Sequence, residues 1–261
     1  MPEGPTLAQL GETELIRRLG AFAPPAQFDD DAALLGPALL GGPPAGDPAL
    51  VLNTDVLVED VHFSEATMGA GDVGWRAAAA NLSDLAAMGC LGAVGITVAL
   101  VAPGHTPWAW VEGAYGGMAE LLGAYGGVLL GGDCSGGRQR LLAVTALGRL
   151  PAGGGAIRRG DGRPGDALVS TGAHGLSRLG LALLRGEALA DLPEASRERA
   201  IRAHRRPVPA AARPQTPHAP LSALRPPFRE RKNYGDRLYL FHHADHARLR
   251  RNREFKPNHR Q

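Results

Sequence analysis

Apolar residues recur along much of the chain in two periods, one typical of strands and one typical of helices. Residues 49–61 and 91–101 are rich in β-branched and apolar side chains, as buried strands are. Residues 72–88 combine many alanines with a 3.6-residue period and end at Gly89, which predicts a buried helix and its C-terminal stop. Further helices are expected at 13–19 and 107–125, and further strands at 128–130 and 140–150. This alternation lacks a strict βαβ repeat, so it predicts a mixed α/β, or α+β, domain over residues 1–150.

A second domain is expected to begin after this pattern. Residues 151–165 are rich in glycine and arginine, which indicates a junction between domains. A strand at 166–171 and a helix at 176–185 are predicted beyond it. Residues 160–209 offer one strand and two helices, too little to enclose a core of their own. We therefore expect residues 151–209 to form an incomplete second α/β domain.

Composition changes abruptly after this segment. Residues 1–209 contain 16 Arg, no Lys and 22 acidic residues, whereas residues 210–261 contain 12 Lys and Arg against 4 acidic residues. The formal charges are −6 and +8, and only one of 36 glycines lies in the second part. Residues 210–261 are either a basic arm for nucleic acid or an anionic surface, or a segment read out of frame and unrelated to the fold. The compositional break favours the second interpretation, and we expect a disordered tail without a regular element or a specific nucleic-acid partner.

The rest of the composition narrows the class of protein. Hydrophobic residues make up 44% of the 261 residues, enough for a sizeable core. No run reaches the roughly 18 apolar residues that cross a bilayer, and no secretory leader is recognisable. Cys90 and Cys134 are too few for a disulfide framework. We expect a cytoplasmic protein with reduced thiols and no membrane partner.

Aspartates stand where strands end or helices begin. Asp30 and Asp31 precede an apolar segment, Asp55 interrupts an apolar strand, Asp84 lies on the alanine-rich helix, and Asp133 follows another apolar strand. A carboxylate among apolar residues is costly to bury unless a partner neutralises it. Any one of them alone is typical of a cap or a buried ion pair. Together they favour a divalent-cation site, and hard oxygen ligands suit Mg²⁺.

Glycines and arginines near these aspartates suggest contact with phosphate. Gly131 and Gly132 before Asp133 would let the backbone approach a phosphate closely, although the tripeptide alone is more typical of a structural turn. No Gly-Lys-Ser/Thr follows, so this is not a Walker A loop. Arg158 and Arg159 could grip phosphate oxygens or simply be solvated.

Residues suited to nucleophilic or acid–base catalysis are not apparent. His62 lies between a valine and a phenylalanine, a context typical of a structural histidine. No Ser-His-Asp or Cys-His arrangement has a supporting context.

Six motifs follow one another between about residue 10 and residue 209. They are LGETELIRRL near the start, DDAALL at 30–35, NTDVLVEDVHF at 53–63, NLSDLAAMG at 81–89, LLGGD at 129–133 and RRGDGRPGDALVSTG at 158–172. This ordered set resembles the thiamine-monophosphate kinase family, which belongs to a superfamily shared with aminoimidazole ribonucleotide synthetase and selenophosphate synthetase.

The resemblance implies an aminoimidazole ribonucleotide synthetase-like N-terminal domain that forms a homodimer and binds ATP. It implies phosphorylation of thiamine monophosphate to thiamine diphosphate by direct, Mg²⁺-assisted in-line transfer from ATP, with no acid–base residue. Carried over by motif, the Mg²⁺ ligands are Asp30 or Asp31, Thr54, Asp55, Asp84 and Asp133. The ATP residues are Gly132, Asp133 and Arg159, and His62 would contact thiamine monophosphate.

Two departures from the family pattern bear on activity. Asn53 stands where the family commonly has serine. A second-domain motif of the form Asp-x-Ser-Asp-Gly-Leu, which supplies further ligands, does not occur in the sequence. We therefore expect reduced or absent kinase activity. A non-catalytic nucleotide-binding remnant and another ATP-using enzyme of the same superfamily stay open as alternatives.

Overall fold

The computed structural model describes residues 5–24, 27–36, 50–151, 154–164, 167–170, 174–187, 192–209 and 238–241. The sequence-based expectations for residues 210–261 therefore lie outside the described residues, except at 238–241. No helix in the described part of the chain is long and apolar enough to cross a membrane.

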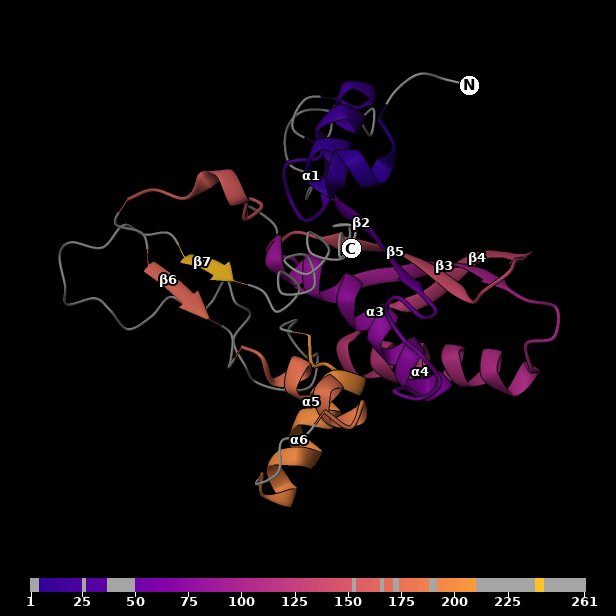
Figure 1. The fold of residues 1–261 in the computed structure, drawn as a ribbon. Helices are drawn as coiled ribbons and strands as arrows, with labels where there is room; N and C mark the ends of the chain where they lie inside the picture. The colour runs from indigo at the N-terminus through magenta and orange to yellow at the C-terminus, as the bar shows by residue number, and fades with distance from the viewer. Residues whose placement is uncertain are drawn as a thin grey trace.

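A five-stranded sheet organises the N-terminal domain (Figure 1). Its strands lie in the order β1-β2-β5-β3-β4, and every neighbouring pair is antiparallel except β3 and β4. The strands are β1 (Ala33–Leu35), β2 (Leu50–Val58), β3 (Ala93–Ala102), β4 (Val128–Gly136) and β5 (Leu141–Arg149). The mixed α/β class expected from the sequence is confirmed.

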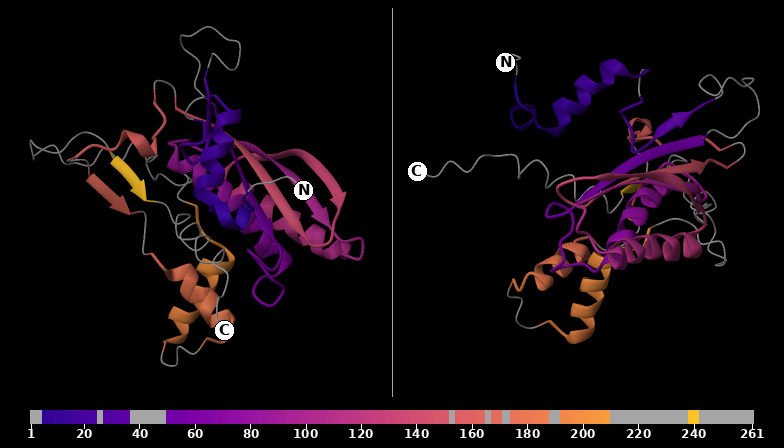
Figure 2. Two further views of the ribbon diagram at one scale, coloured as in Figure 1. Left: turned by 45° about the horizontal axis from the view of Figure 1, so that its top comes forward. Right: turned by 90° about the vertical axis from the view of Figure 1, so that its right-hand side faces the viewer.

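Helices α3 (Ala70–Ala87) and α4 (Trp108–Tyr125) cover one face of the sheet, while α1 (Leu7–Leu19) lies on the other side (Figure 2). Alternate residues of the strands are buried beneath the two helices, among them Val51, Ile96, Leu142 and Val144. The two helices touch backbone to backbone, since a Cβ added at Gly74 would lie 1.7 Å from the carbonyl oxygen of Ala114. This close layer positions the polar residues of α3 against β2.

Helix α1 begins earlier than the sequence pattern predicts. Thr6 caps it, and the Thr6 side chain accepts a hydrogen bond from the backbone of Gln9 while the Gln9 side chain accepts one from the backbone of Thr6. Such a capping box satisfies two backbone donors at a helix start. None of the residues of α1 is buried, so this helix contributes little to the core.

The glycines before Asp133 lie inside strand β4 rather than after it. The sequence predicts a short strand at 128–130, but pairing with β3 continues to Gly136, with a register irregularity between Ile96 and Thr97. A Cβ added at Gly132 would lie 1.9 Å from the carbonyl oxygen of Val98. Gly132 therefore allows a close approach of two strands, which the sequence pattern could not distinguish from a turn.

The second part of the chain contains a pair of helices and a pair of strands. Helices α5 (Leu176–Leu184) and α6 (Glu194–Arg205) pack together beside α3 (Figure 1). Strand β6 (Ala167–Ser170) pairs in parallel with β7 (Leu238–Phe241), and η2 (Arg159–Asp161) precedes them. The expectation of no regular element beyond residue 209 is wrong for β7, because its four apolar and aromatic residues pair with β6.

Candidate metal and nucleotide site

Asp30 and Asp31 meet Arg159 at the start of β1. The antiparallel register places Ala33 opposite Leu52, so the chain before β1 runs beside the Asp55 end of β2. Asp30 Oδ1 accepts a hydrogen bond from the backbone N–H of Arg159 at 2.8 Å, and the Asp31 carboxylate pairs with the Arg159 guanidinium. Two expected metal ligands and one expected ATP residue, 128 positions apart in sequence, therefore lie together.

Asp84 of α3 is joined to β2 by a hydrogen bond from Asn53. The Asn53 side-chain N–H group donates to Asp84 Oδ2 at 3.2 Å and to the carbonyl oxygen of Asn81 at 3.3 Å. The Asn81 amide donates in turn to the carbonyl of Ala77 at 2.9 Å. These donors fix the orientation of both amides.

Fixing the amides leaves two oxygen atoms without donors. Asn53 Oδ1 and Asn81 Oδ1 are buried and have no hydrogen-bond partner. An unsatisfied buried acceptor is uncommon in folded proteins and calls for an explanation. Amide and carboxylate oxygens are the ligands that hard cations prefer, so two unpaired amide oxygens beside Asp84 fit a bound Mg²⁺. Motif reasoning had treated Asn53 only as a departure from serine, and it overlooked the amide of Asn81.

Asp55 and Thr54 lie on opposite faces of β2. Asp55 Oδ1 accepts the backbone N–H of Val56 at 3.0 Å, and its charge acts on Arg76 of α3. Thr54 instead shares a hydrogen bond with Thr145 across the strands, with 2.8 Å between the hydroxyl oxygens. Successive side chains of a strand point to opposite faces. The side chains of Thr54 and Asp55 therefore do not converge on one ion in this arrangement.

Gly132 and Asp133 lie on the far edge of the sheet. The pairing register runs from Asp55 to Val144, then to Val98, and finally to Gly132 on β4. With about 4.8 Å between neighbouring strands, roughly 14 Å separates the backbone of Asp55 from β4. Among the described residues, no three His, Cys, Asp or Glu side chains form a group that could hold a metal ion. The expected ligands thus fall into two groups within one copy of the chain.

Tyr115 of α4 lies beside this edge and was not singled out by the sequence. Burial raises the pKa of the Tyr115 hydroxyl, and the neighbouring Cys134 raises it further. Cys134 is exposed, whereas Cys90 is buried and its burial raises the thiol pKa to about 12. Tyr115 is one of several residues on the buried side of α4, so periodicity alone gave it no special role.

His62 belongs to the turn that follows β2. Its Nδ1 accepts the backbone N–H of Val58 at 3.0 Å, so the neutral ring carries its proton on Nε2. An ionic cluster flanks this turn: Arg140 pairs with Glu59 and, at 2.8 Å, with Glu65. The hydrogen bond from Arg140 lowers the pKa of Glu59. One ring nitrogen of His62 therefore stabilises the turn, and its expected substrate contact stays a prediction.

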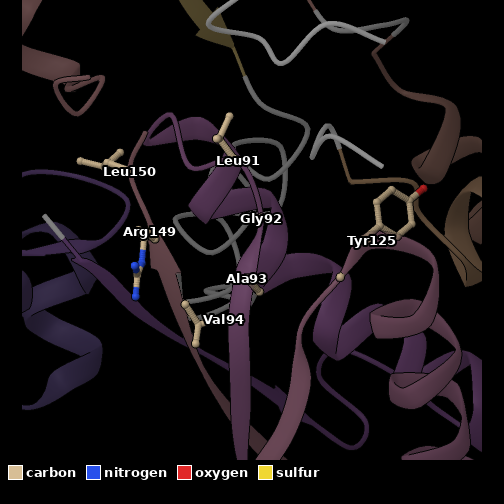
Figure 3. Close-up of a pocket in the computed structure, with 8 residues that line it drawn as sticks. Leu91, Gly92, Ala93, Val94, Tyr125, Arg149 and Leu150 are labelled. Carbon is tan, nitrogen blue, oxygen red and sulfur yellow. The ribbon is translucent and has the colours of Figure 1, made fainter. Parts of the chain in front are cut away.

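A pocket among the described residues lies away from all of these side chains. It measures about 380 Å³ and is bordered by the start of β3, the end of β5 and the C-terminal end of α4 (Figure 3). Its lining is mostly apolar with Arg149 as the charged member. None of the expected site residues lines it.

Comparison with known proteins gives these surfaces a context. The family model for the AIR synthase related protein, N-terminal domain, matches residues 29–150. The thiamine-monophosphate kinase of Prochlorococcus marinus is 47% identical over 206 residues, and that of Synechococcus elongatus is 48% identical over 204 residues. Each match covers 78% of this chain and 59% of the relative, so the chain spans less than two thirds of the length of these relatives.

A solved structure supports the same fold. AaThiL complexed with AMPPCP and TMP matches 80% of this chain and 62% of its own chain, with a TM-score of 0.68 and 28% identity. The similarity extends beyond the N-terminal domain, since residues 29–150 alone are less than half of the chain.

Proposed function

Because residues 29–150 match the AIR synthase related N-terminal domain and the chain is up to 48% identical to thiamine-monophosphate kinases, we propose that it phosphorylates thiamine monophosphate with ATP. The observation that carries the proposal is the set of oxygens between β2 and α3. The Asp84 carboxylate accepts the Asn53 amide N–H there, the side-chain oxygens of Asn53 and Asn81 are buried without donors, and Asp55 lies on the same face of β2 as Asn53. Such a set suits a cation that accompanies a nucleotide.

The residues would act by holding and aligning two anionic reactants. A bound Mg²⁺ would supply positive charge that offsets the phosphate groups. Asp55, Asp84 and Asn53 would hold it, and Asp30, Asp31 and Asp133 are the further proposed ligands. A phosphate oxygen of thiamine monophosphate would attack the γ-phosphorus of ATP in line as the bond to ADP breaks. The attacking oxygen is already ionised, so no general base is needed.

Positioning of the nucleotide is assigned to the arginine and glycine residues. Arg159 is held by Asp30 and Asp31 and offers a guanidinium for phosphate oxygens. Gly132 and Asp133 lie on an exposed edge strand, where ATP could lie against the backbone. His62, anchored through Nδ1, would present its Nε2–H to thiamine monophosphate.

A homodimer through the N-terminal domain, in the cytoplasm, is part of the proposal. The exposed edge of the sheet is apolar, with Val128, Leu129 and Leu130 each about half exposed. An unpaired apolar edge is a common place for contact with another chain. A second copy at this edge would also bring further groups near Asp133, which lies far from Asp55 in one copy.

The proposed activity of this chain is lower than that of its relatives. The Asp-x-Ser-Asp-Gly-Leu motif does not occur in the sequence, and losing one preorganised electrostatic contact typically costs about 10²–10³ in rate. A nucleotide-binding remnant without catalysis is the second candidate, supported by the same departure.

The two candidates are separated by incubating the chain with thiamine monophosphate, ATP and Mg²⁺ and measuring the thiamine diphosphate formed by chromatography. Turnover that requires Mg²⁺ and is lost in Asp84→Asn supports the kinase. Metal-dependent ATP binding without any thiamine diphosphate supports the remnant. If the chain forms no thiamine diphosphate and does not bind ATP, both candidates are contradicted.

A further inference from the structure

The end of α6 is fastened to the N-terminal domain by four consecutive residues, 204–207, which we call the latch. Arg205 Nε donates to the carbonyl oxygen of Thr67 at 2.9 Å. Arg206 pairs with Asp72 at 2.8 Å and with Glu120 at 2.7 Å. His204 and Pro207 also contact this domain, as described in the next paragraph. Contacts from four successive residues indicate a specific docking rather than a loose linker.

Trp75 and Arg76 of α3 receive the two ends of the latch. Trp75 Nε1 donates to the carbonyl oxygen of Pro207 at 2.8 Å, and the Arg206 guanidinium lies 5.3 Å from the Trp75 ring centre. Arg76 Nη1 donates to the carbonyl oxygen of His204 at 2.6 Å. The latch thus presents main-chain oxygens to two neighbouring side chains of α3.

Arg76 contacts the latch and also feels the charge of Asp55. Burial lowers its pKa from the ordinary value, and the charge of Asp55 opposes that effect. Among the described residues Arg76 and Asp55 form no ion pair, and they attract each other only over a longer distance. On the same helix Asp84 follows Arg76 by eight residues, a little more than two turns.

The group that holds Arg76 is neutral. The His204 ring is buried, and burial, followed by the charge of Arg76, lowers its pKa to about 4. Its Nδ1 lies 3.4 Å from Arg76 Nη1 and 3.3 Å from Ser177 Oγ. The carbonyl of residue 204 therefore directs the guanidinium without cancelling its charge.

We propose that the latch sets the cation affinity of the aspartate site by holding Arg76 away from Asp55. With the latch docked, the Arg76 guanidinium donates to the carbonyl oxygen of His204, and Asp55 remains available to a cation. With the latch released, the guanidinium has lost that acceptor and is drawn into an ion pair with Asp55, where it competes with the cation. Arg76 is then a positioning residue that couples the docking of α6 to the metal site. This inference rests on the proposed metal role of Asp55 and Asp84.

The first test measures binding of Mn²⁺ alone to the full chain by electron paramagnetic resonance. Mn²⁺ takes the same hard oxygen ligands as Mg²⁺. Arg206→Ala removes the contacts to Asp72 and Glu120, and we expect the Mn²⁺ dissociation constant to rise about fivefold or more, the range of ordinary site-to-site coupling. Arg199→Ala is the matched control, because Arg199 is exposed on the same helix and outside the latch, and it should leave the constant unchanged.

The second test asks whether the effect passes through Arg76. Arg76→Met keeps an unbranched, flexible apolar stem and removes the charge. In that background Arg206→Ala should no longer weaken Mn²⁺ binding. An equal loss in both backgrounds overturns the coupling through Arg76. Trp75→Phe, which removes the hydrogen bond to Pro207, should weaken binding in the same direction by a smaller factor, and it serves if Arg206→Ala does not fold.

The outcomes separate this inference from the proposed function. If Asp84→Asn abolishes Mn²⁺ binding but Arg206→Ala and Trp75→Phe leave it unchanged, the inference about the latch is overturned. The proposed metal site is then retained. Failure of the unaltered, folded chain to bind Mn²⁺ overturns the metal assignment and this inference with it.

Discussion

Strands β2 and β4 each carry an aspartate after apolar residues, yet they lie in different surroundings. β2 is an interior strand whose alternate residues are buried against α3, and its Asn53 is held by hydrogen bonds to that helix. β4 is an edge strand, and all its residues are exposed. The two strands thus place an aspartate beside a covered, hydrogen-bonded group in one case and on an open surface in the other.

The difference follows from what covers each strand. Beneath a helix, buried N–H groups are usually paired, and the Asn53 amide N–H group donates to Asp84 and to the carbonyl of Asn81. An edge strand can leave its side chains to solvent, a second chain or a ligand. Order in this site therefore comes from α3, whereas the free edge of β4 is the place where we propose that a second copy binds.

The largest difference in unfolding free energy is expected between truncation of an apolar residue on the buried face of the sheet and truncation of one at its exposed edge. Leu142 on β5 is fully buried, whereas Leu129 on β4 is 47% exposed. Leu142→Ala should lower the free energy of unfolding by about 2–5 kcal/mol because it opens a cavity. Leu129→Ala should change it by less than about 0.5 kcal/mol in the monomer.

Denaturant titration at a protein concentration where sedimentation shows monomer measures both variants. A large loss in Leu129→Ala under these conditions would show that the edge is covered within one copy. Sedimentation at higher concentration then tests the proposed dimer, which Leu129→Ala should weaken while Leu142→Ala leaves the contact surface intact.

A smaller effect is expected from the glycine that brings β4 against β3. Gly132→Ala places a methyl group 1.9 Å from the Val98 carbonyl oxygen, so the strands must separate. We expect a loss of about 1–3 kcal/mol in unfolding free energy. Gly136→Ala is the control, since a Cβ there meets no atom within 4 Å. Equal melting temperatures for both variants would refute a packing role for Gly132.

The smallest effect is expected at Thr54. Its hydroxyl faces Thr145 on the open side of the sheet, away from Asp55 and Asp84. Thr54→Val should leave the Mn²⁺ dissociation constant within about twofold and change the unfolding free energy by less than about 1 kcal/mol, the value of one hydrogen bond. A tenfold loss of Mn²⁺ affinity would instead support the metal role that the family resemblance assigns to Thr54.

Much of the fold could be predicted because it rests on local periodicity. The expected helix at 72–88 and strand at 140–150 agree within two residues with α3 and β5. Asp30, Asp31 and Arg159 were each singled out before the structure placed them together. Apolar spacing and motif order carried that information.

The parts that could not be predicted depend on contacts between distant segments. Gly132 resembles a turn residue until the carbonyl of Val98 is placed beside it. The unpaired oxygens of Asn53 and Asn81 arise only when β2 lies against α3. Arg76 precedes a run of alanines, but its partner on α6 is 128 positions away. No local pattern encodes such pairings.

The proposed function depends most on whether the oxygens between β2 and α3 bind a metal–nucleotide complex. Calorimetric titration with a non-hydrolysable ATP analogue, with and without Mg²⁺, tests it directly in Asp84→Asn, with Glu198→Gln on the exposed surface of α6 as the control. We predict that Mg²⁺ strengthens nucleotide binding to the unaltered chain and to the control. In Asp84→Asn the affinity should fall by about 10–100-fold and lose its dependence on Mg²⁺, as expected when a group of the metal site is removed. Unchanged, Mg²⁺-dependent binding in Asp84→Asn would contradict the account.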